Sequence, residues 1–391
     1  MVGLFNNLAV LKMMNGGVCV KRTALIIFVV LLLLSNIEVF SADDCISVSA
    51  DSAVLICSDT GKVLYAKNDR EKRPMASTTK IMTALLALEY SESNNKDVTI
   101  TDEMIRTEGS SMGLMQGYVI SIENIVKGMM MCSGNDAANT LAYAVAGSKE
   151  EFSNLMNERA AQLGMNDTHF VTPSGLDDED HYSTAYDMAM LGAYAMDNKN
   201  FSDIVSQKSI KVKFVNPSET RTYKNHNKLL NLYEGCIGIK TGFTKKAGRC
   251  LVSCAQRDGS KLIAVTLKAP NDWDDHQKMY DYGFSKVRNI ELNEEETRFS
   301  VDVVGALDEQ ITVSGSKTSV TILNEDSEKI KRSIELPSFV YAPITKGQVI
   351  GRIVYSIDDE IIAVNNLTST KDEPLVEKKK SFLEKIFSFF K

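Results

Sequence analysis

The chain has 391 residues, of which 24% are charged and 44% hydrophobic, and its formal net charge is −7 at pH 7. This length is enough for two globular domains of ordinary size. The mildly acidic balance argues against a nucleic-acid partner held by general electrostatics, and we expect none.

A short apolar segment lies near the N-terminus. Lys21 and Arg22 precede an unbroken apolar run over residues 24–34, and small residues before Ala42 fit a signal-peptidase site. The run is too short to span a bilayer comfortably. We predict that residues 1–41 are a signal peptide. The alternative is an uncleaved N-terminal anchor, and either one exports the rest of the chain.

The cysteines and histidines show no pattern of a metal site. Six cysteines remain after residue 41, namely Cys45, Cys57, Cys132, Cys236, Cys250 and Cys254. An even number permits disulfides in an exported protein, but these cysteines lie mostly in apolar strand-like runs, so we expect buried free thiols. The four scattered histidines are His169, His181, His226 and His276, and none has zinc-site spacing. We expect no metal and no cofactor.

The first large domain is predicted to span residues 42–286. In chain order, the patterns predict a hairpin over 52–68, a helix over 81–90 and two helices over 122–146, which are broken at "CSGND" where Asn135 or Asp136 can cap the second. They then predict a helix in the stretch 182–196 with Ser183 or Thr184 as its cap, and three strands over 236–244, 248–256 and 261–269. Strands at both ends with helices between them indicate one mixed sheet in an α/β domain.

The pattern changes after about Phe284. Short β-branched runs separated by turn residues follow from Glu291 to Asn366, with no long helical pattern, and they predict a small all-β domain over residues 287–370. Residues 371–391 are predicted to be a linker and an amphipathic helix.

This terminal helix would be apolar on one face and basic at its edges. The apolar face comprises Phe382, Leu383, Ile386, Phe387 and Phe390, and the lysines are Lys378, Lys379, Lys380, Lys385 and Lys391. An aromatic face with a polybasic flank is typical of a helix that lies on a membrane surface. The alternative is a helix docked on the β domain.

The segment "STTK" places a hydroxyl and an amine close together at the start of the predicted helix over 81–90. Ser77 and Lys80 are three residues apart and therefore project from the same face. Burial against an apolar helix, near other cations, would favour a neutral amine that can take the serine proton. The same spacing recurs at 93–96, 314–317 and 388–391, so this motif alone is weak evidence.

Two later motifs strengthen that interpretation. "SGN", which spans Ser133 to Asn135, lies in the break between two helices, where a hydroxyl and an amide can point into a cleft. "KTG", which spans Lys240 to Gly242, is expected to open a strand, and its glycine would let a substrate backbone pass close to an edge strand.

In this order, the three motifs resemble the active-site set of penicillin-interacting serine enzymes. The longer stretches around them, such as "KRPMASTTKIMTALLALE" and "GIKTGFTKKAGRCLVSCA", resemble the low-molecular-mass penicillin-binding proteins that are D-alanyl-D-alanine carboxypeptidases, the S11 serine peptidases. The resemblance covers roughly residues 44–284, and the β domain with its tail matches the usual C-terminal layout of that family. It implies a β-lactamase/transpeptidase-like fold with a helical subdomain.

The resemblance also implies the catalytic roles. Ser77 would attack the carbonyl of the penultimate D-alanine, Lys80 would be the general base, and Ser133 would relay a proton to the leaving D-alanine. The backbone amides of Ser77 and Phe243 would form the oxyanion hole. Water would then hydrolyse the acyl-enzyme.

Substrate-binding roles follow from the resemblance in the same way. Asn135 would hold the peptide backbone of the substrate, Lys240 would keep the pocket electropositive, Thr241 would bind the terminal carboxylate, and Gly242 would give the substrate room. Alternation along a strand would send Lys240 and Thr241 to opposite faces, so their joint role depends on the family.

The chain departs from some relatives at two positions. Phe243 and Ser174 stand where some family members have histidine, which leaves the substrate preference open.

We therefore expect an exported serine D-Ala-D-Ala carboxypeptidase on the outer face of the bacterial cytoplasmic membrane. Its partners would be peptidoglycan pentapeptide stems, β-lactams as covalent inhibitors, and the membrane surface. A β-lactamase is one alternative, although no convincing "ExxxN" lies between the second and third motifs. A non-catalytic wall-binding protein of the same fold is the other.

Overall fold

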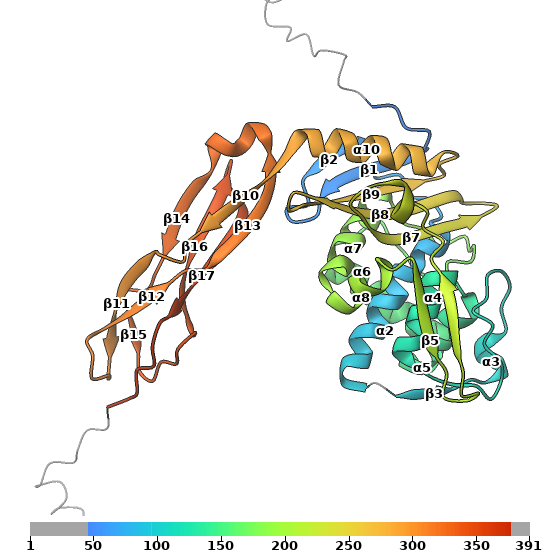
Figure 1. Ribbon diagram of the computed structural model, residues 1–391, viewed down its shortest axis with the longest axis horizontal. Coiled ribbons are helices and arrows are strands. Elements are labelled where there is room, and N and C mark those ends of the chain that lie inside the picture. Colours follow the sequence, from blue (N-terminus) through green and yellow to red (C-terminus); the bar gives the residue numbers. More distant parts are fainter. Residues whose placement is uncertain (1–45, 95, 377–391) are drawn as a thin grey trace, which may run out of the picture. The chain divides into compact units, whose positions relative to one another are not determined.

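The computed structural model describes residues 46–94 and 96–376, which form a mixed α/β domain followed by an all-β domain (Figure 1). The predicted signal peptide, Cys45 and residues 377–391 of the predicted tail lie outside the described residues. Within the described residues, no helix is both long and apolar enough to cross a bilayer.

One five-stranded sheet organises the α/β domain, and it is built from both ends of the domain's sequence, as predicted. Its strand pairs are all antiparallel, so the prediction of a mixed sheet is wrong. Its strands are β1 (Ser52–Cys57), β2 (Val63–Lys67), β7 (Cys236–Thr244), β8 (Gly248–Arg257) and β9 (Ser260–Leu267). The order is β2-β1-β9-β8-β7, so β7 lies at one edge. The hairpin and the three later strands agree with the sequence patterns.

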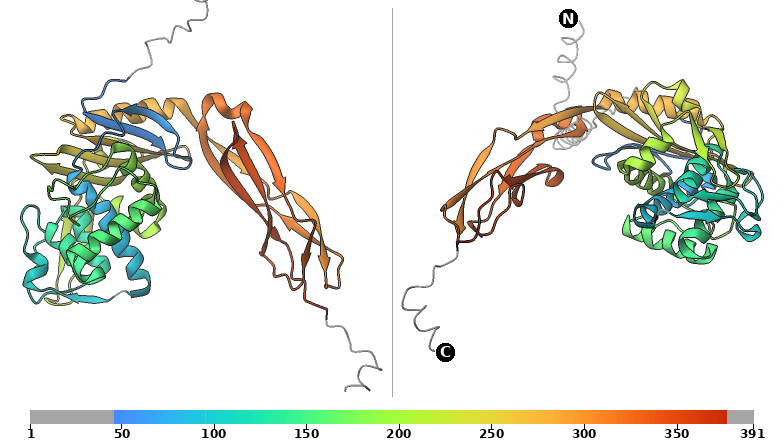
Figure 2. Two further views of the ribbon diagram at one scale, coloured as in Figure 1. Left: turned by 180° about the vertical axis from the view of Figure 1, so that it is seen from behind. Right: turned by 60° about the horizontal axis from the view of Figure 1, so that its bottom comes forward.

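Helices cover both faces of this sheet (Figures 1 and 2). Helix α10 (Asp272–Lys286) lies on one face, and α7 (Ala185–Asp197) packs on the other. Because both faces are covered, all six residues of β1 are buried, which explains its continuous apolar run. Thr184 caps α7, since its hydroxyl accepts a hydrogen bond from the backbone N–H of Asp187 at 3.0 Å.

The residues between β2 and β7 form a region that is mainly helical. Its elements are the 3-10 helix η3 (Ala76–Thr79), α2 (Lys80–Asn94), α3 (Asp102–Ile105), α4 (Ile122–Cys132), α5 (Asn135–Ala146), α6 (Lys149–Gln162), α8 (Lys199–Val205) and α9 (Leu229–Leu232). Two small ribbons complete it, β3 (Asp97–Thr99) with β4 (Val119–Ser121) and β5 (Ser209–Lys213) with β6 (Thr220–Lys224). The break between α4 and α5 falls where the sequence predicted it.

The all-β domain follows α10. Its strands are β10 (Val287–Asn293), β11 (Arg298–Val304), β12 (Gln310–Ser314), β13 (Lys317–Leu323), β14 (Lys331–Glu335), β15 (Phe339–Tyr341), β16 (Val349–Ile357) and β17 (Glu360–Ser369), with a 3-10 helix η4 (Asn324–Lys329). Six strands form one sheet in the order β14-β16-β17-β12-β11-β15, and β10 pairs with β13. Alternate residues such as Val301, Val313 and Ile353 are buried in its core.

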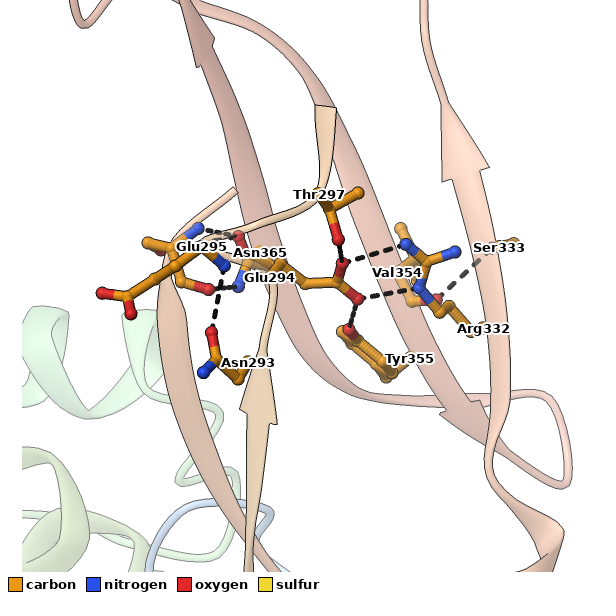
Figure 3. A network of polar contacts seen from close by, with 10 residues as sticks. Asn293, Glu294, Glu295, Thr297, Arg332, Ser333, Val354, Tyr355 and Asn365 are labelled. Atoms are coloured by element: carbon orange, nitrogen blue, oxygen red, sulfur yellow. Dashed lines mark hydrogen bonds and ion pairs between the residues drawn. The ribbon is translucent and has the colours of Figure 1, made fainter. Parts of the chain in front are cut away.

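A buried carboxylate links several strands of this domain (Figure 3). Glu294 is 6% exposed and accepts hydrogen bonds from Nε of Arg332 at 2.8 Å and from Nη2 at 3.0 Å. The hydroxyls of Thr297 and Tyr355 also donate to it. Every polar atom of this carboxylate therefore has a partner, as buried charges require.

Replacing Glu294 by glutamine is expected to lower the unfolding free energy by about 1–3 kcal/mol at neutral pH, because it leaves the Arg332 guanidinium without its anion. The hydrogen bonds from Arg332 hold the pKa of Glu294 down to about 2, below its ordinary value of 4.5. A lowered carboxyl pKa stabilises the fold above the ordinary value, and this contribution is lost as the pH falls through the lowered one. Calorimetric unfolding at neutral pH and near pH 2 should therefore show the difference between wild type and variant shrink in acid.

Glu335→Gln is the matched control for that measurement. Glu335 pairs with Arg352 at 2.6 Å, and both side chains are 52% exposed, so we expect little change in stability. Equal destabilisation by the two variants would contradict a special role for the buried carboxylate.

Candidate active site

Ser77 lies in the 3-10 turn η3, which runs directly into α2 at Lys80. The hydroxyl of Thr78 donates to the carbonyl of Met75 at 2.6 Å, and the hydroxyl of Thr79 donates to the carbonyl of Ala76 at 2.8 Å. These local bonds stabilise the turn in place of a full α-helical turn. Ala76 has a φ of 48°, which is uncommon for a non-glycine residue and is held here by the surrounding contacts.

Two glycines from different segments pack closely against this turn. A Cβ on Gly242 of β7 would lie 3.0 Å from the carbonyl oxygen of Met75 and 3.0 Å from the nitrogen of Ser77. A Cβ on Gly175, whose φ is 82°, would lie 2.0 Å from the carbonyl oxygen of Ala76. Only glycine lets both backbones approach so closely, so these contacts set the position of Ser77.

The amine of Lys80 has three polar neighbours. Its Nζ lies 3.0 Å from Oγ of Ser77, 2.7 Å from Oδ1 of Asn135 and 2.6 Å from the carbonyl oxygen of Ser174. The last two atoms can only accept hydrogen bonds, and they use the two N–H donors of a neutral amine. Its lone pair then faces the hydroxyl of Ser77, which is the geometry of a general base beside a nucleophile.

Burial favours the neutral form of this amine. Complete burial, with a further contribution from the charge of Lys240, lowers the pKa of Lys80 well below its ordinary value. Burial also lowers the pKa of Lys240 to about 8, so Lys240 is mostly protonated at neutral pH. Nζ of Lys240 donates to the carbonyl of Thr241 at 2.9 Å. The site therefore combines an amine whose neutral form is favoured with a neighbouring positive charge.

Ser133 and Asn135 occupy the break between α4 and α5. Ser133 is in the left-handed conformation with a φ of 62°, and it ends α4. Asn135 begins α5, and its side chain is oriented by a donated bond from Nδ2 to the carbonyl of Glu108 at 2.7 Å. That bond turns Oδ1 toward Lys80. The predicted "SGN" residues therefore lie beside the predicted "STTK" residues.

Asp136 was predicted only as a possible cap of α5, but the N-cap position is Gly134, and Asp136 instead anchors the loop that passes over this break. Its carboxylate accepts hydrogen bonds from the Ser111 hydroxyl at 2.6 Å and from the backbone N–H groups of Met112, Gly113 and Leu114 at 2.7–3.1 Å. In the sequence, the signal for this role is an acidic residue in the first turn of the helix that follows "SGN".

The third motif lies in the middle of β7, the strand predicted over 236–244, so the expectation that "KTG" opens a strand is wrong. The strand begins at Cys236, because residues before Lys240 continue the pairing with β8. Lys240 turns inward and is 2% exposed. Thr241 lines the pocket, and β7 is an edge strand, so the predicted edge for an extended peptide is present in the sheet order.

An open cavity of about 520 Å³ lies in front of the nucleophile. Its lining residues are Ser77, Ser110, Ser133, His226, Lys228, Thr241, Gly242, Phe243, Arg249, Asp272 and Trp273. The side chains of Lys80, Asn135 and Lys240 are buried behind this wall. The structure thus brings all predicted site residues together around one pocket and adds Arg249 and Trp273 to it.

His181 supports the site from behind. Its Nδ1 accepts a hydrogen bond from the backbone N–H of Val171 at 2.9 Å, so Nε2 carries the hydrogen and donates to Oγ1 of Thr79 at 2.9 Å. Burial lowers its pKa to about 4, which keeps the ring neutral. The ring ties the start of α2 to the loop that carries Ser174.

The described cysteines are free thiols, namely Cys57, Cys132, Cys236, Cys250 and Cys254. Burial raises the pKa of Cys57 and of Cys250 to about 12, so both remain protonated and unreactive. In the part of the chain that the structure covers, no cluster of histidine, cysteine or acidic side chains is arranged to hold a metal ion.

Comparisons with known proteins agree with this geometry. The family model described as D-alanyl-D-alanine carboxypeptidase (peptidase S11) matches residues 38–271, and that of the penicillin-binding protein 5 C-terminal domain matches residues 299–375. D-alanyl-D-alanine carboxypeptidase DacF of Bacillus subtilis is 33% identical over 335 residues, which are 83% of this chain and 85% of that protein. D-alanyl-D-alanine carboxypeptidase DacA of Escherichia coli is 30% identical over 363 residues, or 88% and 87% of the two chains.

Solved structures give the same result. The crystal structure of penicillin-binding protein 5 from Haemophilus influenzae is 28% identical, with a TM-score of 0.63, and the match covers 84% of this chain and 99% of that one. The DD-transpeptidase of Streptomyces K15 is 32% identical over the matched part in one of its variants, with a TM-score of 0.59 and coverage of 62% and 100%. These matches confirm the predicted resemblance and the predicted fold class of both described domains.

Proposed function

Because the chain belongs to the D-alanyl-D-alanine carboxypeptidase family of serine peptidases, we propose that it removes the terminal D-alanine from peptidoglycan pentapeptide stems through an acyl-enzyme. The observation that carries the proposal is the buried amine of Lys80, which lies 3.0 Å from the hydroxyl of Ser77 at the back of an open pocket. An alcohol beside a neutral base is the arrangement that acyl transfer to serine needs.

Acylation begins when Oγ of Ser77 attacks the carbonyl carbon of the penultimate D-alanine and its proton passes to Nζ of Lys80. The developing oxyanion is bound by the backbone N–H groups of Ser77 and Phe243. When the tetrahedral intermediate collapses, the C–N bond breaks, and the amine of the leaving D-alanine takes a proton relayed from Lys80 by the hydroxyl of Ser133.

Hydrolysis completes the cycle. Water attacks the ester on Ser77, the stem leaves with one D-alanine fewer, and the serine hydroxyl is restored. Asn135 and the edge strand β7 hold the backbone of the stem, and the charge on Lys240 stabilises the anionic substrate. A β-lactam is attacked in the same way and stays attached to Ser77, so these antibiotics are covalent inhibitors.

The cellular setting is part of the same proposal. The basic and apolar segment before Ala42 supports export, and the aromatic and basic residues after position 377 support attachment to the outer face of the cytoplasmic membrane. Both segments lie outside the described residues.

The test is the release of D-alanine from a synthetic peptide that ends in D-Ala-D-Ala, together with labelling by a fluorescent penicillin and the rate at which that label is lost. Release of D-alanine and slow loss of label would support the proposal. Rapid loss of label without D-alanine release would favour a β-lactamase. Absence of both would favour a non-catalytic wall-binding protein.

A further inference from the structure

One end of the β domain carries a group of exposed apolar and aromatic side chains. Phe339 and Tyr341 are two residues apart on β15, so both project from the same face, while Val340 between them packs against the core. Their rings are in edge contact, with centroids 5.4 Å apart. Val304 of β11 is the pairing partner of Tyr341 and is also exposed. A strand face that meets only water normally carries polar residues, so this composition needs an explanation.

Two further segments add to the same surface. Leu307 lies in the turn that follows β11, and its side chain is 82% exposed. The last described residues return to this turn, because the backbone N–H of Val376 donates to the carbonyl of Gly305 at 2.7 Å. A Cβ on Gly305 would lie 3.2 Å from Cδ1 of Leu375, so that side chain packs over the turn. We call this surface the apolar tip, and its exposed residues are Val304, Leu307, Phe339, Tyr341, Leu375 and Val376.

The charged groups next to the apolar tip are paired within the domain. Lys371 forms ion pairs with Asp308 and Glu373. The carboxylate of Asp372 accepts a hydrogen bond from the backbone N–H of Lys346 at 2.7 Å. The tip therefore presents apolar area without an excess of positive charge. Single exposed apolar residues are ordinary, but a group drawn from three segments at one end of a domain marks an interaction surface.

The place where the chain leaves the domain indicates what the apolar tip meets. The bond between Val376 and Gly305 fixes this place, which lies beside β11 and β15 (Figure 1). Phe382, the first aromatic residue of the predicted membrane-binding segment, follows six residues later. A fully extended chain spans roughly 20 Å over that interval. A bilayer that holds this segment therefore lies within about that distance of the tip.

We propose that the apolar tip inserts into the interfacial region of a lipid bilayer, so that the β domain itself contacts the membrane beside the C-terminal segment. The inference rests on the membrane attachment proposed above. Aromatic side chains are favoured at the boundary between headgroups and acyl chains, where the ring of Tyr341 is buried and its hydroxyl stays in contact with water. Stable attachment to a bilayer surface commonly takes two separate contacts. The tip supplies one by apolar burial, and the basic segment supplies the other.

The test is sedimentation of the chain from residue 42 to residue 391 with lipid vesicles at low and at high salt. One set of vesicles is phosphatidylcholine, and the other also contains phosphatidylglycerol. Leu307→Ser combined with Tyr341→Ser should weaken binding about 10-fold on both sets, because two apolar side chains no longer leave water. Salt should not change this factor, since no charge is removed.

A second variant separates the apolar tip from the C-terminal segment. Replacing Lys378, Lys379 and Lys380 together by glutamine should weaken binding only on the vesicles that contain phosphatidylglycerol, and most strongly at low salt. Loss of binding by apolar burial and loss by charge then have different dependences on lipid and on salt.

Ile334→Ser combined with Ile361→Ser is the matched control. Both side chains are exposed on the same domain, on β14 and β17, and β14 is the edge strand opposite β15 in the sheet order. This control should bind like the wild type, and all variants should keep the wild-type melting temperature. Insertion is measured directly with Leu307→Trp. Brominated lipid should quench its fluorescence far more than that of the wild type, in which Trp273 is the only tryptophan.

Equal binding by the tip variant and its control, or no added quenching in Leu307→Trp, would overturn the inference and leave attachment by the C-terminal segment intact. A lipid-free wild-type dimer that the tip variant converts to a monomer would also overturn it, because the tip would then be an interface between two copies. A wild type that binds neither set of vesicles would overturn the proposed membrane attachment as well. Release of D-alanine from a soluble peptide tests the catalytic proposal separately.

Discussion

Ser77→Ala is expected to abolish D-alanine release and covalent labelling by penicillin. The hydroxyl is the atom that forms the acyl bond, and no other described hydroxyl lies within hydrogen-bonding distance of Nζ of Lys80. When a nucleophile acts together with its base, removing the nucleophile lowers the rate on the order of 10⁵-fold or more. The substitution deletes one partly exposed oxygen, so the melting temperature should stay close to that of the wild type. Mass spectrometry after incubation with penicillin measures the result directly.

Ser93→Ala is the matched control for Ser77→Ala. Ser93 also precedes a lysine, Lys96, by three residues, but it lies at the exposed end of α2. This variant should be labelled and should release D-alanine at the wild-type rate. Labelling of Ser77→Ala at another residue would refute the assignment of the nucleophile.

Lys80→Met is the second substitution with a large expected effect. The variant keeps a long apolar side chain in a buried site but has no base, so acylation by penicillin should slow by about 10²- to 10⁴-fold, the usual contribution of general-base catalysis. Stopped-flow or quench measurement of the acylation rate separates this effect from deacylation. Lys96→Met, at an exposed position, should acylate normally.

The pH dependence of the wild type tests the same assignment. Lys80 must be neutral to accept a proton, so the acylation rate should rise as Lys80 loses its proton and then level off. Because burial lowers its pKa well below the ordinary value of 10.5, this rise should be complete at a pH where an ordinary lysine is still charged. Lys240 has a pKa of about 8, so the rate should fall again above that pH as its charge is lost. If the acylation rate continued to rise up to pH 10.5, Lys80 would have the pKa of an exposed lysine and would not be the base.

Much of the domain order could be read from local patterns. Each group of elements has its own signal in the sequence. Turn residues mark the hairpin around Gly61, a break separates the two helices on either side of Gly134, and alternation of side chains marks the three strands, one of which carries Lys240. The three motifs also indicated which residues lie together in the site. For segments more than 100 residues apart, that prediction depended on the resemblance to a family.

The parts that sequence could not predict depend on tertiary contacts. Arg249 looks like an ordinary strand residue until the pairing of β7 and β8 puts it opposite Phe243. Asp136 becomes an anchor only when the loop over 108–114 folds back on it, and His181 becomes a support only when it reaches Thr79.

Gly175 and Gly242, which pack against the turn of Ser77, make this part of the pocket, its floor, less tolerant of substitution than the rim. A Cβ at Gly175 would lie 2.0 Å from the carbonyl oxygen of Ala76, and one at Gly242 would lie 3.0 Å from the nitrogen of Ser77, so a side chain at either position would shift the backbone that carries the nucleophile. Phe243 has no such constraint, because its side chain is 64% exposed at the rim of the pocket. Differences in substrate choice or antibiotic susceptibility between lineages should therefore accumulate at the rim, while the floor stays the same.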